Sequence, residues 1–176
     1  MLRLWREEDG TLIGEDNRAE CYGADLIGPG WDRWAEVMPD ALESQDDDWL
    51  WDQMHDPSLW RSHRPRRLKS GGYSQMRVNL RWACDLLCLG EFNIAYVRGL
   101  AHALEAQGES ECLVYRAHGA GEPRCECTGW EGQAFLLRDV IDGHRARYWP
   151  PGAGRPDVFS VPSGFNCHHS IRRVGS

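Results

Sequence analysis

The sequence has no long hydrophobic run, and this absence excludes several classes of protein. No stretch approaches the roughly eighteen consecutive apolar residues that a membrane-spanning helix needs. The segment from Met1 to Glu8 contains no apolar core of the kind found in a secretory signal. We therefore expect a soluble protein that is made in the cytosol and has no membrane partner.

Signatures of the common catalytic classes are also absent. There is no glycine-rich phosphate loop and no His-Glu-x-x-His metalloprotease motif. The seven cysteines are an odd number, and Cys84 and Cys88 fall inside a predicted helix, where core packing is the expected role. A complete disulfide framework is therefore not expected, and reduced thiols together with a metal ion fit this usage better.

What the chain does contain is enough apolar sequence for one ordinary domain. It has 176 residues, 41% of them hydrophobic and nine of them tryptophan. Its formal net charge of −7 argues against a surface that coats nucleic acid over its whole area. A local basic patch is compatible with that charge.

Two short segments near the C-terminal end carry paired metal-type ligands. Cys125 and Cys127 lie two positions apart in the first segment, and Cys167 and His169 lie two positions apart in the second. Residues i and i+2 of an extended segment point to the same side, so each pair can present both donors to one ion. Four such donors satisfy a tetrahedral zinc ion, which predicts a structural zinc site.

Three alternatives to this site stay open. The fourth ligand could be His168 or His144 in place of His169. A disulfide could join the two segments in place of a metal ion. The cysteines could also be ordinary buried thiols, because cysteine is among the most buried residue types.

An acidic segment in the first half of the chain carries several tryptophans. Residues 46–56 hold five aspartates around Trp49 and Trp51, and Trp60 lies just beyond them. A run of this kind is typical of a solvated face. The large rings in so polar a segment predict anchors for the surface of another protein.

A basic tract follows this acidic segment. Its cations are Arg61, Arg64, Arg66, Arg67 and Lys69. One interpretation is contact with the phosphates of a nucleic acid, without base readout. The other is a surface loop whose cations pair with the acidic segment upstream.

Periodicity predicts helices first and strands afterwards, in an α+β fold. Before the basic tract we expect a hairpin over residues 2–13, a loop over 14–30 and a helix from Trp31 to Leu42. After it we expect two helices over 74–90 and 93–108, then short strands over 112–116, 134–137, 158–161 and 170–174, with a loop over 142–156. Residues 1–72 would form a mainly helical docking region that includes the hairpin. Residues 73–176 would add the helical pair to a small zinc-knuckle-like α+β domain with short antiparallel strands.

Residues 93–174 resemble the C-terminal domain of the tailed-phage minor head proteins, the head-morphogenesis family typified by protein F of phage Mu. The resemblance rests on a helix ending at Gly108, a strand, the Arg124-Cys125-Glu126-Cys127 knuckle, Trp130-Glu131-Gly132-Gln133, Pro162 and the terminal Asn166-Cys167-His168-His169-Ser170. It places Cys127 at the first knuckle's histidine, and Cys167 and His169 at the terminal pair. Cys125 has no fixed counterpart in the Arg-x-x-His version of the motif. The N-terminal part is shorter than the long helical region usual in that family.

This resemblance implies a low-copy virion component that is assembled in the host cytoplasm. Such a protein would act in head assembly at the portal or neck, in a ring or other multi-copy arrangement. Its partner would be the portal or a capsid protein, with the packaged DNA as a further contact. It would have no enzymatic activity.

Two other functional classes compete with this interpretation. One is a small thiol or metal-dependent enzyme of the nuclease or toxin type. It would use Cys125 or Cys167 with His144 or His168, or a phosphate-binding cluster that includes Arg116, His118, Arg124 and Arg145. The other is a free-standing zinc module that binds nucleic acid.

Overall fold

The computed structural model describes residues 23–117, 126–148, 157–163 and 167–175, apart from the side chains of residues 126, 127, 144–146 and 148. Its elements in chain order are α2 (Gly28–Ser44), α3 (Asp47–Met54), the 3-10 turn η1 (Pro57–Leu59), β1 (His63–Arg67), β2 (Tyr73–Arg77), α4 (Leu80–Ala106), β3 (Glu111–Arg116), η2 (Glu126–Trp130), β4 (Ala134–Leu136), α5 (Leu137–Tyr148) and β5 (His169–Arg173). The fold is α+β, as predicted. The hairpin predicted over residues 2–13 lies outside the described residues.

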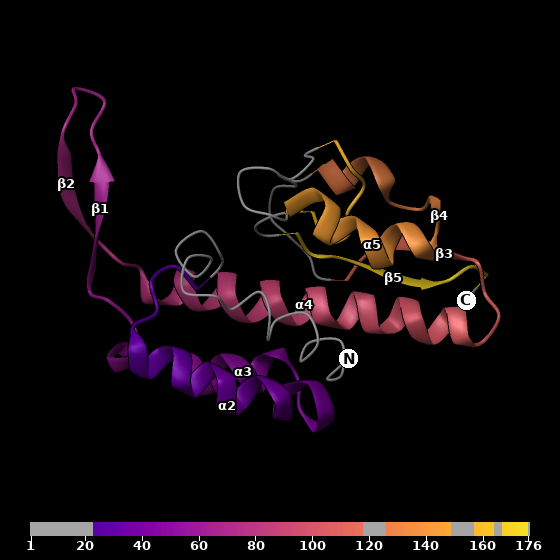
Figure 1. Ribbon diagram of the computed structural model, residues 1–176, viewed down its shortest axis with the longest axis horizontal. Coiled ribbons are helices and arrows are strands. Elements are labelled where there is room, and N and C mark those ends of the chain that lie inside the picture. Colours follow the sequence, from indigo (N-terminus) through magenta and orange to yellow (C-terminus); the bar gives the residue numbers. More distant parts are fainter. Residues whose placement is uncertain (1–22, 118–125, 149–156, 164–166, 176) are drawn as a thin grey trace.

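Helix α4 is the element on which the rest of the molecule packs. Helices α2 and α3 lie along one side of it, and α5 with the second sheet lies along the other (Figure 1). The first half of α4 contributes Cys84, Leu87 and Cys88 to a core shared with α2 and α3. The second half contributes Val97 and Ala101 to a core shared with the sheet and α5. One helix therefore supports two separate cores.

The prediction of two helices here is wrong. Helix α4 runs unbroken for 27 residues through Gly90, and Met76 lies in strand β2. The side chain of Asn79, not Ser74, caps the helix by accepting a hydrogen bond from the Trp82 amide at 3.2 Å. A glycine inside a helix costs only about 1 kcal/mol. Burial of the residues on either side of Gly90 outweighs that cost, whereas Gly108, at φ 87°, does end the helix region.

Helix α2 begins earlier than the sequence predicted and continues through a proline. It starts at Gly28, inside the predicted loop, and includes Pro39. A proline inside a helix removes one backbone hydrogen bond. The helix persists because Val37, Met38 and Ala41, on either side of that proline, are buried in the first core.

The three tryptophans that were predicted to anchor a partner protein all contact the protein's own first core, and Trp60 is buried in it. Trp60 is 5% exposed, and its indole nitrogen donates to the carbonyl oxygen of Met54 at 2.8 Å. The Trp51 indole nitrogen donates to Asp85 on α4 at 2.8 Å. Trp49 also packs against the first core. Trp60 is therefore a core residue, and that part of the prediction is wrong. Trp49 and Trp51 are only partly buried, so their role as anchors stays a prediction.

The second sheet is antiparallel, with β3 between β4 and β5. These three strands confirm the predictions over 112–116, 134–137 and 170–174. Two other predictions are wrong, because residues 142–148 belong to helix α5 and no strand forms over 158–161. The loop was predicted because this segment, which includes Gly143, is rich in glycine and proline. At Gly143, α5 passes very close to the backbone of Phe159. A Cβ here would collide with the Phe159 carbonyl oxygen, so only glycine fits.

The basic tract forms part of a two-stranded antiparallel hairpin, β1–β2, that stands away from the rest of the molecule (Figure 1). The predicted domain boundary between residues 72 and 73 falls at the turn of this hairpin. The division between buried clusters falls inside α4 instead. Across the described residues, no helix combines the length and apolar character needed to cross a membrane.

We predict that Gly143→Ala lowers the free energy of unfolding by about 1–3 kcal/mol, because the new methyl group must displace the Phe159 backbone. Gly129→Ala is the matched control, since a Cβ there meets no atom within 4 Å. Replacing that glycine should be neutral, or stabilising by up to about 1 kcal/mol. Urea unfolding of both variants measures the difference. Equal stabilities would contradict the close packing of α5 on residue 159.

Candidate functional site

Three segments bring a chain of polar side chains together at one end of the second sheet. Arg116 is the last residue of β3 and pairs in register with His169, the first residue of β5. Glu131 follows η2 directly. The Glu131 carboxylate accepts a hydrogen bond from Arg116 Nε at 2.7 Å and lies 2.6 Å from His169 Nε2. On the other side of the imidazole, Nδ1 lies 3.5 Å from the Cys167 sulfur.

The charges in this array determine which ring nitrogen carries the proton. Hydrogen bonds from His169 and then Arg116 hold the pKa of Glu131 below its ordinary value. An ionised carboxylate can only accept hydrogen bonds, so His169 Nε2 must be the donor. In the neutral imidazole, Nδ1 then carries a lone pair that faces the Cys167 sulfur.

A side chain of helix α4 holds the backbone of the segment that contains Cys167 and His169. The Asn93 side-chain amide donates to the carbonyl oxygens of Cys167, at 3.3 Å, and of His169, at 3.0 Å. These two residues are themselves buried, at 8% and 2% exposure. A single helical side chain therefore sets the conformation of the backbone that presents both donors.

The Cys167–His169 pair has the dimensions of half a tetrahedral zinc site. Zn–S bonds of about 2.3 Å and Zn–N bonds of about 2.0–2.1 Å at the tetrahedral angle place sulfur and nitrogen about 3.6 Å apart. The observed separation is 3.5 Å. A metal-bound histidine usually donates its other N–H to a carboxylate, which is the role that Glu131 occupies here. The donor chemistry of this pair therefore fits zinc.

The structure brings two of the four predicted ligands together. Cys125 lies outside the described residues, as does the side chain of Cys127, whose backbone belongs to η2. Within the described part of the chain, no group of three or more His, Cys, Asp or Glu side chains forms a metal site. Of the alternative ligands, His168 lines a pocket, and the side chain of His144 is outside the description.

The remaining described cysteines are core residues, as the sequence predicted for Cys84 and Cys88. Burial raises the pKa of Cys84 to about 12 and that of Cys112 to about 11. Burial raises the pKa of Cys88 further still. Thiols of this kind are poor nucleophiles and poor ligands at neutral pH, because the reactive species is the thiolate.

Three residues of the array were not predicted as parts of this site. Glu131, Arg116 and Asn93 come from three separate elements, and they meet the ligand segment only after α4 and β3 have packed. The sequence offers one weak indication, since a ligating histidine generally needs a carboxylate partner. Nothing in the spacing selects Glu131 from the other acidic residues.

A pocket of about 350 Å³ opens beside this array. Phe92, Asn93 and Tyr96 of α4 line it, together with Tyr115 of β3 and Cys167. Three aromatic rings and a few polar groups are the usual composition of a small-ligand site. Cys167 is therefore part of the lining of this pocket as well as of the polar array.

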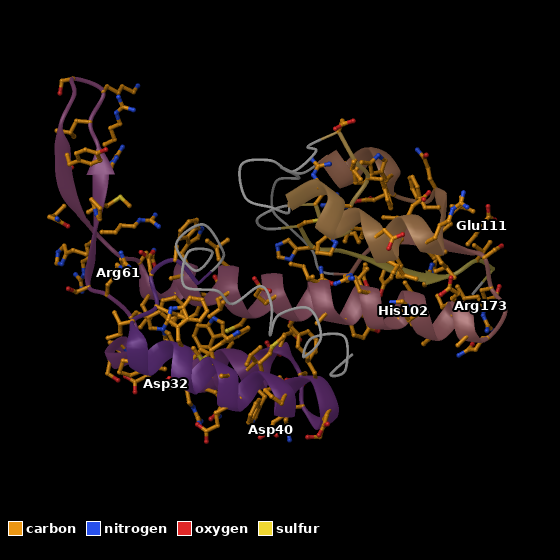
Figure 2. All side chains as sticks on the ribbon, viewed as in Figure 1. Asp32, Asp40, Arg61, His102, Glu111 and Arg173 are labelled. Carbon is orange, nitrogen blue, oxygen red and sulfur yellow. The ribbon has the colours of Figure 1, made fainter. Side chains whose placement is uncertain are left out.

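The cations of the basic tract divide into two groups. Arg61 and Arg64, at the base of the hairpin, face Asp25, and the Arg64 Nη1 donates to that carboxylate at 3.0 Å (Figure 2 labels Arg61). Among the described ion pairs, none joins Arg66, Arg67 or Lys69 to an acidic side chain. The expected pairing with residues 46–56 is likewise not found among these contacts, so that alternative is corrected.

Comparison with known proteins adds no family to this description. No family model, no curated protein and no solved structure matches the chain.

We predict that Asn93→Ala lowers the free energy of unfolding by about 1–3 kcal/mol, because two buried carbonyl oxygens lose their donor. His102→Ala, a partly exposed position on the same helix, is the control and should change stability by less than about 0.5 kcal/mol. Chemical unfolding measures both. If Asn93→Ala is as stable as the control, the amide does not hold the ligand segment.

Proposed function

We propose that the protein is a structural component whose C-terminal half is held together by one zinc ion. Cys167 and His169 would supply two ligands, and Cys125 and Cys127 the other two. The observation that carries this proposal is the donor pair itself, with its 3.5 Å separation and with the Glu131 carboxylate on the far ring nitrogen. When bound, zinc would cross-link the start of β5 to the segment that follows β3.

This ligand set favours a structural role over a catalytic one. Four protein ligands leave no open coordination position for water or substrate. The metal would contribute to folding instead, because its binding free energy is available only to the folded chain. The second core is built from α4, α5 and three short strands, so such a cross-link would add stability to a small unit.

The resemblance of residues 93–174 to the phage minor head family supplies the biological setting of the proposal. In that setting the chain is a virion protein, assembled in the host cytoplasm, that joins portal or capsid subunits in several copies. The support for this part is the order of helix, strand and ligand pairs in the sequence. The long α4, which supports a core on each side, suits a protein that connects neighbours.

A thiol enzyme is the second candidate, and one observation favours it. Cys167 lines the pocket, His169 Nδ1 faces its sulfur, and Glu131 orients the imidazole. This is the nucleophile–base–orienter arrangement of thiol catalysis. The chemistry would be attack of the Cys167 thiolate on a carbonyl carbon after His169 accepts the thiol proton. The C=O π electrons would move to the oxygen and then return to expel a leaving group, which would take the proton back from His169.

We predict that the purified protein carries about one zinc ion per chain, measured by elemental analysis. Cys167→Ser and His169→Ala should each abolish stoichiometric zinc and lower the melting temperature, because each removes a ligand. Glu131→Gln should retain the metal with affinity reduced about 10- to 100-fold, since the imidazole loses its orienting carboxylate. Cys112→Ser replaces a buried thiol on β3 and should keep the zinc.

The same variants separate the two candidate functions. A metal-free protein whose Cys167 alkylates rapidly at neutral pH, with loss of that reactivity in His169→Ala, would favour the enzyme. Retention of zinc by Cys167→Ser would contradict the proposed ligand set.

We predict that the protein co-purifies with a portal or capsid protein from the lysate of infected cells. The association should survive both high salt and nuclease treatment, because it depends on protein contacts. Affinity purification followed by mass spectrometry measures it, with an unrelated tagged protein of similar charge as the control. Loss of all partners after nuclease treatment would indicate the free-standing nucleic-acid-binding class instead.

A further inference from the structure

The charge of this acidic protein is strongly segregated along the chain. From Pro57 to Cys84 there is no aspartate or glutamate, whereas the same stretch contains seven arginine or lysine residues. The whole chain nevertheless has a formal net charge of −7. A concentrated positive segment on an acidic protein attracts polyanions at one place only.

This positive segment is displayed on the β1–β2 hairpin, away from the acidic body (Figure 2). Two five-residue strands at about 3.4 Å per residue give the hairpin a length of roughly 17 Å. Gly71 and Gly72 form its tip with φ values of 86° and 79°, which suits a tight turn. The cations are therefore carried on an ordered arm instead of a loop.

The two faces of the arm differ. On the inner face, Arg64 binds Asp25 and lies 5.6 Å from the centre of the Trp82 ring, which fixes the base of the arm to the body. The outer face has the cross-strand pairs His63–Arg77 and Arg67–Tyr73, all exposed, with Tyr73 at 73%. The third pair on this face is Pro65–Gln75, which is also exposed.

The cations toward the tip are available for an external anion. Arg66, Arg67 and Lys69 are exposed, as is Arg77 on the second strand. None of the ion pairs in the described part of the chain involves these four residues. Arg61 and Arg64 serve the attachment of the arm instead.

We propose that the β1–β2 hairpin is a nucleic-acid-binding arm that contacts the phosphate backbone of duplex DNA through Arg66, Arg67, Lys69 and Arg77. A two-stranded ribbon fits the major groove, which is about 12 Å wide. Arginine forks match phosphate oxygens, and the exposed apolar side chains of residues 63–77 are Pro65, Leu68 and Tyr73, scattered among these cations. Binding is independent of sequence. This inference goes beyond the proposed structural role and does not depend on the metal.

The test measures binding of a fluorescent 20-base-pair duplex by the full-length protein at several salt concentrations. Wild-type affinity should fall linearly with salt on a double-logarithmic plot. Arg66→Gln/Arg67→Gln should bind about 10- to 30-fold more weakly near 0.15 M salt, with a salt slope reduced by about two. Arg138→Gln/Arg172→Gln changes the net charge equally at exposed positions outside the arm and should bind like the wild type.

Equal loss in the two double variants, or no duplex binding by the wild type, overturns the proposal. Two further probes define the ligand. Tighter binding to a single strand than to the duplex, with dependence on Tyr73, overturns the duplex assignment, and so does stronger binding to anionic phospholipid vesicles. Zinc content is measured on the same samples and should be unchanged, so a failure here is distinct from a failure of the metal site.

Discussion

The rest of this structure depends on the burial of two opposite faces of one helix. The first half of α4 completes a core with α2 and α3, and the second half completes a core with the β4–β3–β5 sheet and α5. Neither core could form without its half of the helix. This arrangement explains why the helix continues through Gly90, where local preference alone favours a break. It also places Asn93, between the two halves, under the segment that carries Cys167 and His169.

The polar array beside this helix is compatible with two kinds of chemistry because both need the same imidazole. A zinc ligand and a general base each require a histidine whose tautomer is fixed by a carboxylate on the opposite nitrogen. Glu131 meets that requirement, and the hydrogen bonds from His169 and from Arg116 hold the pKa of its carboxyl group low. The burial of both donors is shown, and the sequence holds two further cysteines, Cys125 and Cys127, on which the metal proposal draws. The adjoining pocket is the feature that supports the thiol enzyme instead, because a purely structural zinc site does not need one.

Positive and negative charges are concentrated in different parts of the described structure. Acidic residues are spread over the helical body, whereas the hairpin carries the concentrated cations and is attached by ion pairs to Asp25 at its base. Such an arm can meet a polyanion while the body remains repelled by it. The separation is physical as well as electrostatic, because the hairpin stands away from both cores.

The sequence by itself determined the α+β class, three of the sheet strands, the core role of Cys84 and Cys88, and the closeness of the Cys167 and His169 side chains. Each of these follows from a local pattern of period, burial or spacing. Glycine misled the same approach, because Gly90 and Gly143 lie inside helices that only long-range packing holds. Tertiary structure alone decided that Trp60 is a core residue and that Glu131, Arg116 and Asn93 join the array around Cys167 and His169. Those contacts join residues far apart in the chain, and no local pattern encodes which distant side chains will meet.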